Sequence, residues 1–325
     1  MLVSRDTPHP SGDSSASTRP VALVGSTGFV GSGVLHALLE SDDSVCVLTR
    51  SYPNPISGVQ TITAPTGLDS EPTIRELLNG ARAVIHAASY TGEDEGEQYR
   101  TNVVGTSRLL KISTQLHIPR FIYVSTCGVY GDSLQPGMSE DEVAPNPQSA
   151  LSKSRYAAET IVRENGGIIV RPHFILGRGD RWVIPTYLQL VRRYPALAHV
   201  EGGRTSFINR KRLGQIVTMI CQARTLRHDL YHVADPQPTS ARTVLRTIAG
   251  LSPLLGQEKG PTPRPVRHER AVLPEVLRSK ARFLLEDTWV STARLTSELV
   301  EAKSRFGLID AEDAEWYRKT YMPNW

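Results

Sequence analysis

A glycine-rich turn between an apolar strand and an amphipathic helix constrains the fold of this chain most. The apolar run Val21–Val24 ends at a glycine, and the chain continues Gly25-Ser26-Thr27-Gly28-Phe29-Val30-Gly31. From Phe29 onward the apolar residues recur with helical period, which predicts a strand, a tight turn and a helix in succession. A turn of this kind presents unpaired backbone N–H groups and the positive end of the helix dipole to the phosphates of a ligand.

Each of the three glycines in the turn is needed for a different physical reason. Gly25 permits the turn, Gly28 lets a pyrophosphate approach the backbone, and Gly31 lets the helix pack against its strand. The spacing is GxxGxxG instead of the general GxGxxG, and a surface turn is the alternative interpretation; the flanking strand and helix favour a dinucleotide site. The cofactor contacts expected here are Gly25, Ser26, Thr27, Gly28, Phe29, Val30 and Gly31.

Length, composition and charge exclude several other classes of protein. The chain has 325 residues, of which 39% are hydrophobic and 22% charged, which is ordinary for a globular protein with one large domain and a smaller one. The net charge of +4 is dispersed, so neither a nucleic-acid partner nor a membrane is expected. Three cysteines lie far apart without CxxC spacing, which argues against a metal site and a disulfide framework and predicts a reducing, cytoplasmic location. The sequence leaves the oligomeric state open.

Arg50 predicts which dinucleotide is bound. It follows the expected strand Ser44–Thr49, at the place where an acidic residue would accept hydrogen bonds from the adenosine ribose of NAD. An arginine instead offers its guanidinium to a 2′-phosphate. Since an exposed residue after a strand is the alternative, the prediction of NADPH depends on this one side chain.

Strands and helices alternate further along the chain. A Pro- and Gly-rich loop after Arg50, a helix over Thr73–Asn79, strands over Ala83–Ser89 and Arg120–Ser125, and a helix over Leu295–Phe306 are expected. This alternation predicts a doubly wound α/β Rossmann fold with a parallel sheet and a smaller C-terminal substrate domain. The expected divisions are a disordered leader over 1–19, an NADP-binding domain over 20–175 to which later chain returns, and a substrate domain with lid over 176–325.

The end of the third expected strand carries Ala87, Ala88 and Ser89, small residues that allow a cofactor to lie close over it. His86, inside the same apolar strand, is expected to be a core histidine and not a catalytic base. Trp182–Tyr194 has helical spacing of apolar and aromatic residues, and is expected to pack in the core or to cover a flat ligand as a lid.

Several segments, taken together, resemble the extended short-chain dehydrogenase/reductase family, which includes sugar-nucleotide epimerases, dehydratases and ketoreductases. The similarity runs from roughly Val21 to Ala249 and follows the order and spacing of the family's motifs. The segments that carry it are Gly25–Gly31, Val84–Ala88, Asn102–Thr106, Tyr123–Gly131, Leu151–Lys153, Arg171–Gly177 and Gly202–Ile208. Asn102 and Pro172 lie in these segments, so the resemblance adds them to the cofactor-binding residues.

The resemblance implies a catalytic hydroxyl, a tyrosine and a lysine. Thr126, four residues before Tyr130, matches the hydroxyl that hydrogen-bonds the substrate carbonyl, and Lys153 matches the lysine that binds the nicotinamide ribose. The tyrosine expected four residues before that lysine is replaced by Ser149. A serine hydroxyl is too weak an acid to protonate the carbonyl oxygen directly. Tyr156, three residues past Lys153, lies a helical turn from the expected point and is expected to pack in the helix.

Three explanations of the missing acid stay open: loss of catalysis, a water chain through Ser149 and Lys153, or a proton from the substrate itself. A ketone flanked by a phenolic hydroxyl supplies its own proton as hydride arrives, and such ketones occur in aromatic polyketides. We therefore expect an NADPH-dependent ketoreductase that acts on an angucyclinone-type aromatic ketone in antibiotic biosynthesis, with Thr126, Ser149 and Lys153 as the catalytic residues. The alternatives are a sugar-nucleotide epimerase or dehydratase, and a regulator that binds NADPH without catalysis.

Overall fold

A parallel sheet of seven strands forms the centre of the computed structural model, which describes residues 19–50, 56–194, 202–250, 286–303 and 307–323. The strand order is β10-β6-β5-β4-β1-β2-β3, and every neighbouring pair is parallel. The strands are β1 (Val21–Val24), β2 (Val45–Thr49), β3 (Val59–Thr63), β4 (Ala83–His86), β5 (Phe121–Val124), β6 (Ile168–Pro172) and β10 (Leu230–Val233). The predicted Rossmann fold is confirmed.

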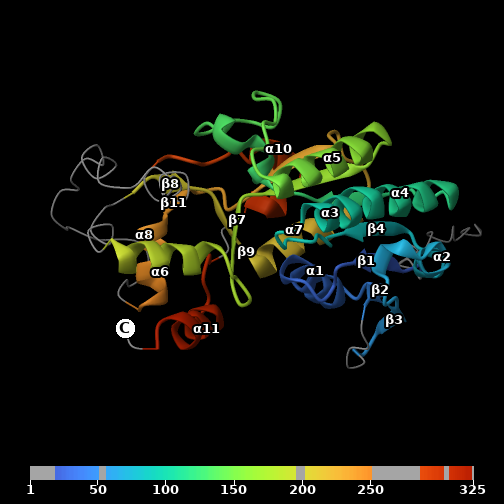
Figure 1. Cartoon of the computed structure of the whole chain (residues 1–325), viewed down its shortest axis with the longest axis horizontal. Helices are drawn as coiled ribbons and strands as arrows, with labels where there is room; N and C mark the ends of the chain where they lie inside the picture. The colour runs from blue at the N-terminus through green and yellow to red at the C-terminus, as the bar shows by residue number, and fades with distance from the viewer. Residues whose placement is uncertain (1–18, 51–55, 195–201, 251–285, 304–306, 324–325) are drawn as a thin grey trace, which may run out of the picture.

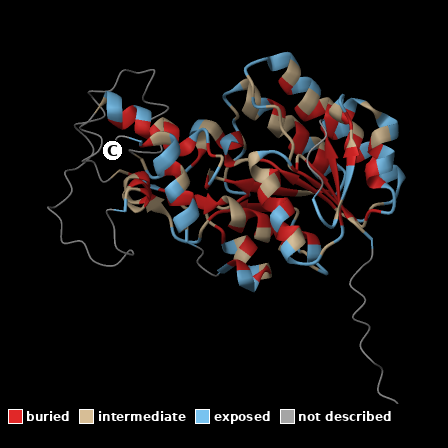
Figure 2. Cartoon of the chain, turned by 90° about the horizontal axis from the view of Figure 1, so that it is seen from below, coloured by how far each residue is buried: buried red, intermediate tan, exposed pale blue. Residues whose placement is uncertain are grey.

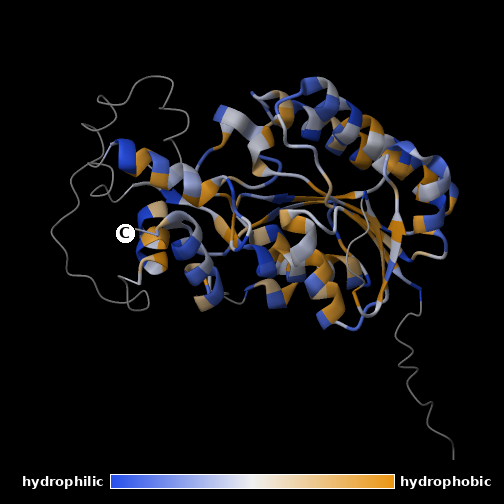
Figure 3. Ribbon diagram, turned by 60° about the horizontal axis from the view of Figure 1, so that its bottom comes forward, coloured by the Kyte–Doolittle hydropathy of each residue, from blue (hydrophilic) through white to orange (hydrophobic). Residues whose placement is uncertain are grey.

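Helices cover both faces of the sheet, which is why its inner strands are apolar without alternation. Residues of one strand point in turn to two separate cores: Val21 and Leu23 to one, Ala22 and Val24 to the other. The first core is closed by α1 (Phe29–Glu40), α7 (Arg210–Gln222) and α10 (Ala293–Glu298), and the second by α2 (Glu71–Leu78), α4 (Thr106–Gln115) and α5 (Ala150–Glu164). Buried residues follow the strands and the inner faces of these helices in Figure 2, and Figure 3 shows the same positions as hydrophobic.

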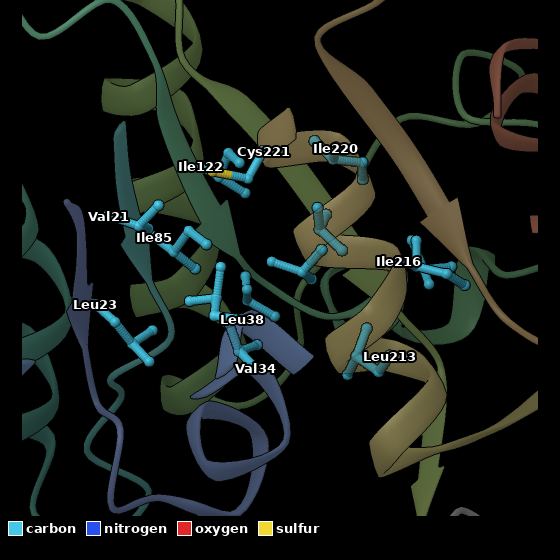
Figure 4. Close-up of a cluster of buried hydrophobic side chains, with 14 of the residues drawn as sticks. Val21, Leu23, Val34, Leu38, Ile85, Ile122, Leu213, Ile216, Ile220 and Cys221 are labelled. Atoms are coloured by element: carbon cyan, nitrogen blue, oxygen red, sulfur yellow. The ribbon is translucent and has the colours of Figure 1, made fainter. Parts of the chain in front are cut away.

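Helices α1 and α7 pack closely because glycines meet at their crossing. A Cβ atom on Gly214 would overlap the Gly33 carbonyl oxygen, and one on Gly33 would lie 2.7 Å from the Arg210 carbonyl oxygen. Figure 4 shows side chains of both helices, among them Leu38 and Leu213, in one cluster with side chains of β1, β4 and β5. The later chain thus returns to the nucleotide-binding half through α7 and β10.

A second, smaller core lies at one end of the sheet (Figure 1). It is built by α6 (Val183–Arg193), α8 (Ala241–Ile248) and α11 (Ala311–Tyr321). Two short sheets connect it to the rest, β7 (Phe174–Leu176) with β9 (Phe207–Asn209) and β8 (Arg204–Thr205) with β11 (Thr239–Ser240). Most of α6 is buried here, so it is a core helix, although Trp182 before it is 67% exposed.

Two sequence predictions were wrong. The expected loop after Arg50 contains β3, an edge strand whose mostly accessible side chains left no apolar run to detect. The expected helix over Leu295–Phe306 is instead α10 followed by a short 3₁₀ segment, Val300–Lys303, and the last described helix is α11. The expected leader falls, apart from Arg19, outside the described residues.

Candidate functional site

The carboxyl ends of β1 and β4 meet at the point where the strand order reverses. In open parallel sheets ligands bind outside this reversal, because loops to opposite faces separate there. Gly25 follows β1 with φ 92°, a conformation that favours glycine, and a Cβ atom on it would lie 2.6 Å from the Ala88 nitrogen. The turns after the two strands are therefore in contact, and the predicted residues Ala87, Ala88 and Ser89 lie beside the glycine-rich turn.

The N-terminus of α1 fits a dinucleotide pyrophosphate. Its N-cap is Gly28, which makes no side-chain capping hydrogen bond, and its first turn has no acidic residue. By contrast, α2, α5, α7 and α8 begin at residues whose side chains accept a backbone N–H: Ser70, Ser149, Asn209 and Ser240. Gly31 packs so closely that a Cβ atom there would overlap the Gly25 carbonyl oxygen. The helix thus keeps its N–H groups and dipole for an anionic ligand.

Other predicted cofactor contacts lie around this turn. Ser26 is buried, whereas Thr27 is exposed at the turn. Phe29 lies under the loop after β7, since a Cβ atom on Gly179 would be 3.1 Å from its ring. Arg50 is exposed at the carboxyl end of β2, with its side-chain stem beside Gly67.

Asn102 joins three elements at the end of β4. It lies in a π-helical segment, Tyr99–Gly105, a rare conformation that is frequent at functional sites. Its Oδ1 accepts from Ser89 Oγ (3.2 Å) and from the Tyr90 nitrogen (2.7 Å). Its Nδ2 donates to the Tyr90 carbonyl (3.1 Å) and to Ser154 Oγ (3.0 Å) on α5. The oxygen and the nitrogen of the Asn102 amide are thus both hydrogen-bonded within the protein. Asn102 therefore fixes the loop after β4, on which a cofactor would lie.

Arg155 is a site residue that the sequence interpretation missed. Its Nε donates to Ser89 Oγ at 3.1 Å, so the guanidinium of α5 reaches the carboxyl end of β4. Burial lowers the pKa of this guanidinium from its usual value, although an arginine stays charged at neutral pH. Ala158 and Val162, three and seven residues further on, belong to the core beneath α5 and share this face of the helix.

Lys153 lies on a different face of the same helix. Residues two positions apart in an α-helix are about 200° apart around its axis, so Lys153 and Arg155 point in nearly opposite directions. Lys153 is exposed, as are Thr160 and Glu164 on the same side. Its role at the nicotinamide stays a prediction, and the cation of α5 that forms a hydrogen bond at the end of β4 is Arg155.

Ser149 and Lys153 lie one turn apart at the start of α5, as expected, because the Lys153 nitrogen donates to the Ser149 carbonyl oxygen at 2.9 Å. The helix begins at Ala150, and Ser149 is its N-cap. The Ser149 hydroxyl accepts from the Ser152 nitrogen (3.1 Å) and donates to Ser152 Oγ (3.0 Å). Capping therefore uses both the acceptor and the proton of this hydroxyl.

Thr126 begins the turn after β5, and its Oγ1 accepts from the Gly128 nitrogen at 3.0 Å. A Cβ atom on Gly128 would lie 3.3 Å from this oxygen and 3.5 Å from Ser152 Oγ, so the two hydroxyls flank the same glycine. Because Oγ1 serves as the acceptor in that bond, the Thr126 proton remains a donor for a ligand oxygen. Pro172 ends β6 at the same edge of the sheet.

The tyrosines close to α5 have other contacts. Tyr130 is fully buried and bonds to Arg171 (2.6 Å) and His232 (2.7 Å), and burial raises the pKa of its phenol above the usual range. Tyr156 packs against the core that contains Tyr130 and lines a cavity of about 550 Å³ with Glu159. Tyr90, which the sequence interpretation did not consider, folds its phenol over Gly92.

His86 is a core histidine, as predicted. It is the last residue of β4 and is buried, and its Nε2 is 2.9 Å from Thr106 Oγ1. Since Thr106 Oγ1 donates to the Asn102 carbonyl (2.6 Å), Nε2 is the donor to Thr106. Burial lowers the pKa of His86 to about 4, so the ring is neutral.

Comparison with known proteins places the chain among its relatives. The model of the NAD dependent epimerase/dehydratase family matches residues 21–197, which is more than half of the chain. The chain belongs to this family. It is an NAD(P)-dependent oxidoreductase of the extended short-chain dehydrogenase/reductase type. Within the described ranges, no helix combines the length and apolar character that crossing a bilayer requires.

Individual relatives within this family differ in chemistry. The chain is 28% identical over 247 residues to 4-hydroxy-2-methyl-3-oxo-4-farnesyl-3,4-dihydroquinoline-1-oxide ketoreductase of Stigmatella aurantiaca, covering 70% of this chain and 71% of that one. It is 25% identical over 249 residues to UDP-glucose 4-epimerase of Vibrio cholerae, covering 71% and 75%. The crystal structure of the Bordetella bronchiseptica enzyme WbmH in complex with NAD+ superposes with a TM-score of 0.68 at 18% identity, over 94% of this chain and 99% of that one.

Proposed function

We propose that this enzyme is an NADPH-dependent ketoreductase that reduces a ketone of an angucyclinone-type aromatic polyketide, with the proton supplied by a phenol of the substrate. The observation that carries this proposal is the face of α5 turned toward Ser89. It presents Arg155 and, one turn earlier, the apolar Leu151, while Tyr130 is held in a buried network and Tyr156 lies toward the cavity beside Glu159. A phenol on the substrate would provide the acid in their place.

The chain's own residues divide the remaining tasks. When bound, the reduced nicotinamide supplies the hydride that reduces the carbonyl carbon. The α1 N-terminus with Gly25 and Gly28 would bind the pyrophosphate, and Thr126 would donate its hydroxyl proton in a hydrogen bond to the carbonyl oxygen. Asn102 keeps the loop after β4 in position through its hydrogen bonds to the Tyr90 backbone, and this loop would support the bound cofactor.

The preference for NADPH rests on Arg50. It is exposed at the end of β2, where the adenosine ribose of a dinucleotide lies in this fold, and its guanidinium suits a 2′-phosphate. Arg50→Ser should raise the KM for NADPH by about tenfold or more and leave the KM for NADH nearly unchanged, because one charge-assisted contact to phosphate is lost. Equal KM values of the natural enzyme for both cofactors would contradict this part of the proposal.

The ketoreductase from Stigmatella supports a ketone on a fused ring system, since the substrate in its name is a bicyclic dihydroquinoline. The direct test is the reduction of peri-hydroxytetralone, a bicyclic ketone whose phenol lies beside the carbonyl. The reaction is monitored as the loss of NADPH absorbance. We expect peri-methoxytetralone, which lacks only that proton, to react about a hundredfold or more slowly, the usual contribution of general acid catalysis. Equal rates would refute the substrate as the acid.

A sugar-nucleotide epimerase is the second candidate, favoured by the similarity to the Vibrio cholerae epimerase. An epimerase of this kind requires tightly held NAD. Purified protein that contains NAD and interconverts UDP-glucose and UDP-galactose would establish this function instead. A protein that binds NADPH but acts on neither substrate class would be a regulator.

A further inference from the structure

Arg155 lies at the site without a carboxylate of its own. Other arginines in this part of the chain are paired: Arg171 with Glu159 at 2.5 Å and Arg163 with Asp229 at 3.1 Å. Glu159 is four residues after Arg155, the spacing at which a helix normally forms an ion pair, but Arg171 occupies its carboxylate. Among the described residues, no Asp or Glu oxygen lies within ion-pair distance of Arg155, whose hydrogen-bond partner is the neutral Ser89 hydroxyl.

The terminal nitrogens of Arg155 are not completely buried. They make no hydrogen bond with the described residues, and neither of them is a fully buried polar atom without a partner. A partly buried guanidinium without a counter-charge is unfavourable, and an anionic oxygen is the partner that recovers the lost hydration. The guanidinium is placed by its Nε, which lies 3.1 Å from Ser89 Oγ at the carboxyl end of β4, beside the loop that Asn102 fixes. Its titratable neighbour is the buried Tyr123 of β5, whose phenol pKa burial raises above the usual range.

We propose that Arg155 binds the phenol oxygen of the substrate and stabilises it as the phenolate. This inference rests on the proposed function and deepens it, because it names the group that makes the substrate's phenol acidic. A guanidinium beside a phenol favours the ionised form and so lowers the phenol pKa, typically by about 1–3 units. The phenol then releases its proton to the adjacent carbonyl oxygen as that oxygen gains negative charge. The phenolate remains paired with Arg155 until water returns a proton to it.

Arg155 and Lys153 provide a matched comparison on one helix. Arg155 contacts Ser89, whereas Lys153 is exposed on the opposite face of α5, so the proposal assigns the ligand at the end of β4 to the first cation. Arg163, paired with Asp229 and two turns beyond Arg155, is the control for a change of net charge on α5.

The test is an absorbance titration of peri-hydroxytetralone bound to the full-length enzyme with NADP⁺, which prevents reduction. We expect the bound phenol to titrate at least about one pH unit below the free compound. Arg155→Met should abolish this shift, Arg155→Lys should retain part of it, and Arg163→Met should preserve it. Binding of NADPH, followed by its fluorescence, confirms that each variant is folded.

Each outcome bears on one of the two claims. An unchanged titration in Arg155→Met, or a shift lost in Lys153→Met instead, would overturn the assignment of Arg155 while leaving ketone reduction by the natural enzyme intact. Failure of the natural enzyme to bind or reduce peri-hydroxytetralone would overturn the proposed function, and the inference with it.

Discussion

The ion pair between Arg171 and Glu159 holds α5, and with it Arg155, against the sheet. Arg171 is 1% exposed and Glu159 fully buried, and three guanidinium-to-carboxylate hydrogen bonds of 2.5–3.1 Å join them. Glu159→Met leaves a buried guanidinium whose remaining side-chain hydrogen bond, among the described residues, is the one to the Tyr130 hydroxyl at 2.6 Å. Breaking a buried pair from one side costs about 3–5 kcal/mol of the free energy of unfolding.

The double variant Glu159→Met with Arg171→Met removes both charges and should recover most of that loss. Replacing a buried pair by apolar side chains of similar volume is often neutral or stabilising, and the Tyr130 hydroxyl keeps His232 as a partner at 2.7 Å. Equilibrium unfolding in urea measures both free energies, and NADPH binding reports whether the site survives. A loss below about 1 kcal/mol for Glu159→Met, or a double variant as unstable as the single one, would refute this reasoning.

Three further predictions concern stability and the roles of single side chains. Gly214→Ala should cost about 1–3 kcal/mol in urea unfolding, because its Cβ atom overlaps the Gly33 carbonyl oxygen; an unchanged midpoint would contradict the close α1–α7 crossing. Ser149→Ala should lower the free energy of unfolding by about 1 kcal/mol, because a helix cap is lost, and should slow ketone turnover less than tenfold. A fall in turnover of about a hundredfold or more would show instead that Ser149 relays a proton. Burial lowers the pKa of His86 to about 4, so below pH 6.5 the unfolded chain binds more protons and the free energy of unfolding falls as the pH drops toward 4. His86→Gln should make the free energy of unfolding less dependent on pH in this range, and an unchanged pH dependence would refute the prediction.

The glycine-rich turn and the strands around it were predictable from sequence because local pattern determines them. Val21–Val24 is apolar on both sides, and Gly25 and Gly31 are required by backbone contacts that no side chain permits. The edge strand β3 was missed since only one of its five residues is fully buried, which leaves neither an apolar run nor a clear alternation. The position of α11 depends on long-range contacts, because its buried side chains pack in one core with those of α8.

The orientation of α5 was the part of the site that spacing alone did not determine. The spacing correctly put Ser149 and Lys153 one turn apart, since the Lys153 nitrogen donates to the carbonyl of the N-cap Ser149, but it did not show which side chains of α5 reach β4. The signal that identifies Arg155 was present: Leu151, Ala158 and Val162 define an apolar stripe, and Arg155 falls within it while Lys153 falls opposite.

The most direct test of the central claim compares two ketones in two enzymes. The ratio of kcat/KM for peri-hydroxytetralone to that for peri-methoxytetralone measures how much the substrate's own proton contributes to the reaction. We expect a ratio of about a hundred or more in the natural enzyme, from general acid catalysis, and a ratio at least about tenfold smaller in Arg155→Met, because one unit of phenol pKa corresponds to about 1.4 kcal/mol. A ratio near one in the natural enzyme would contradict substrate-supplied protonation, and the same large ratio in both enzymes would contradict the role of Arg155.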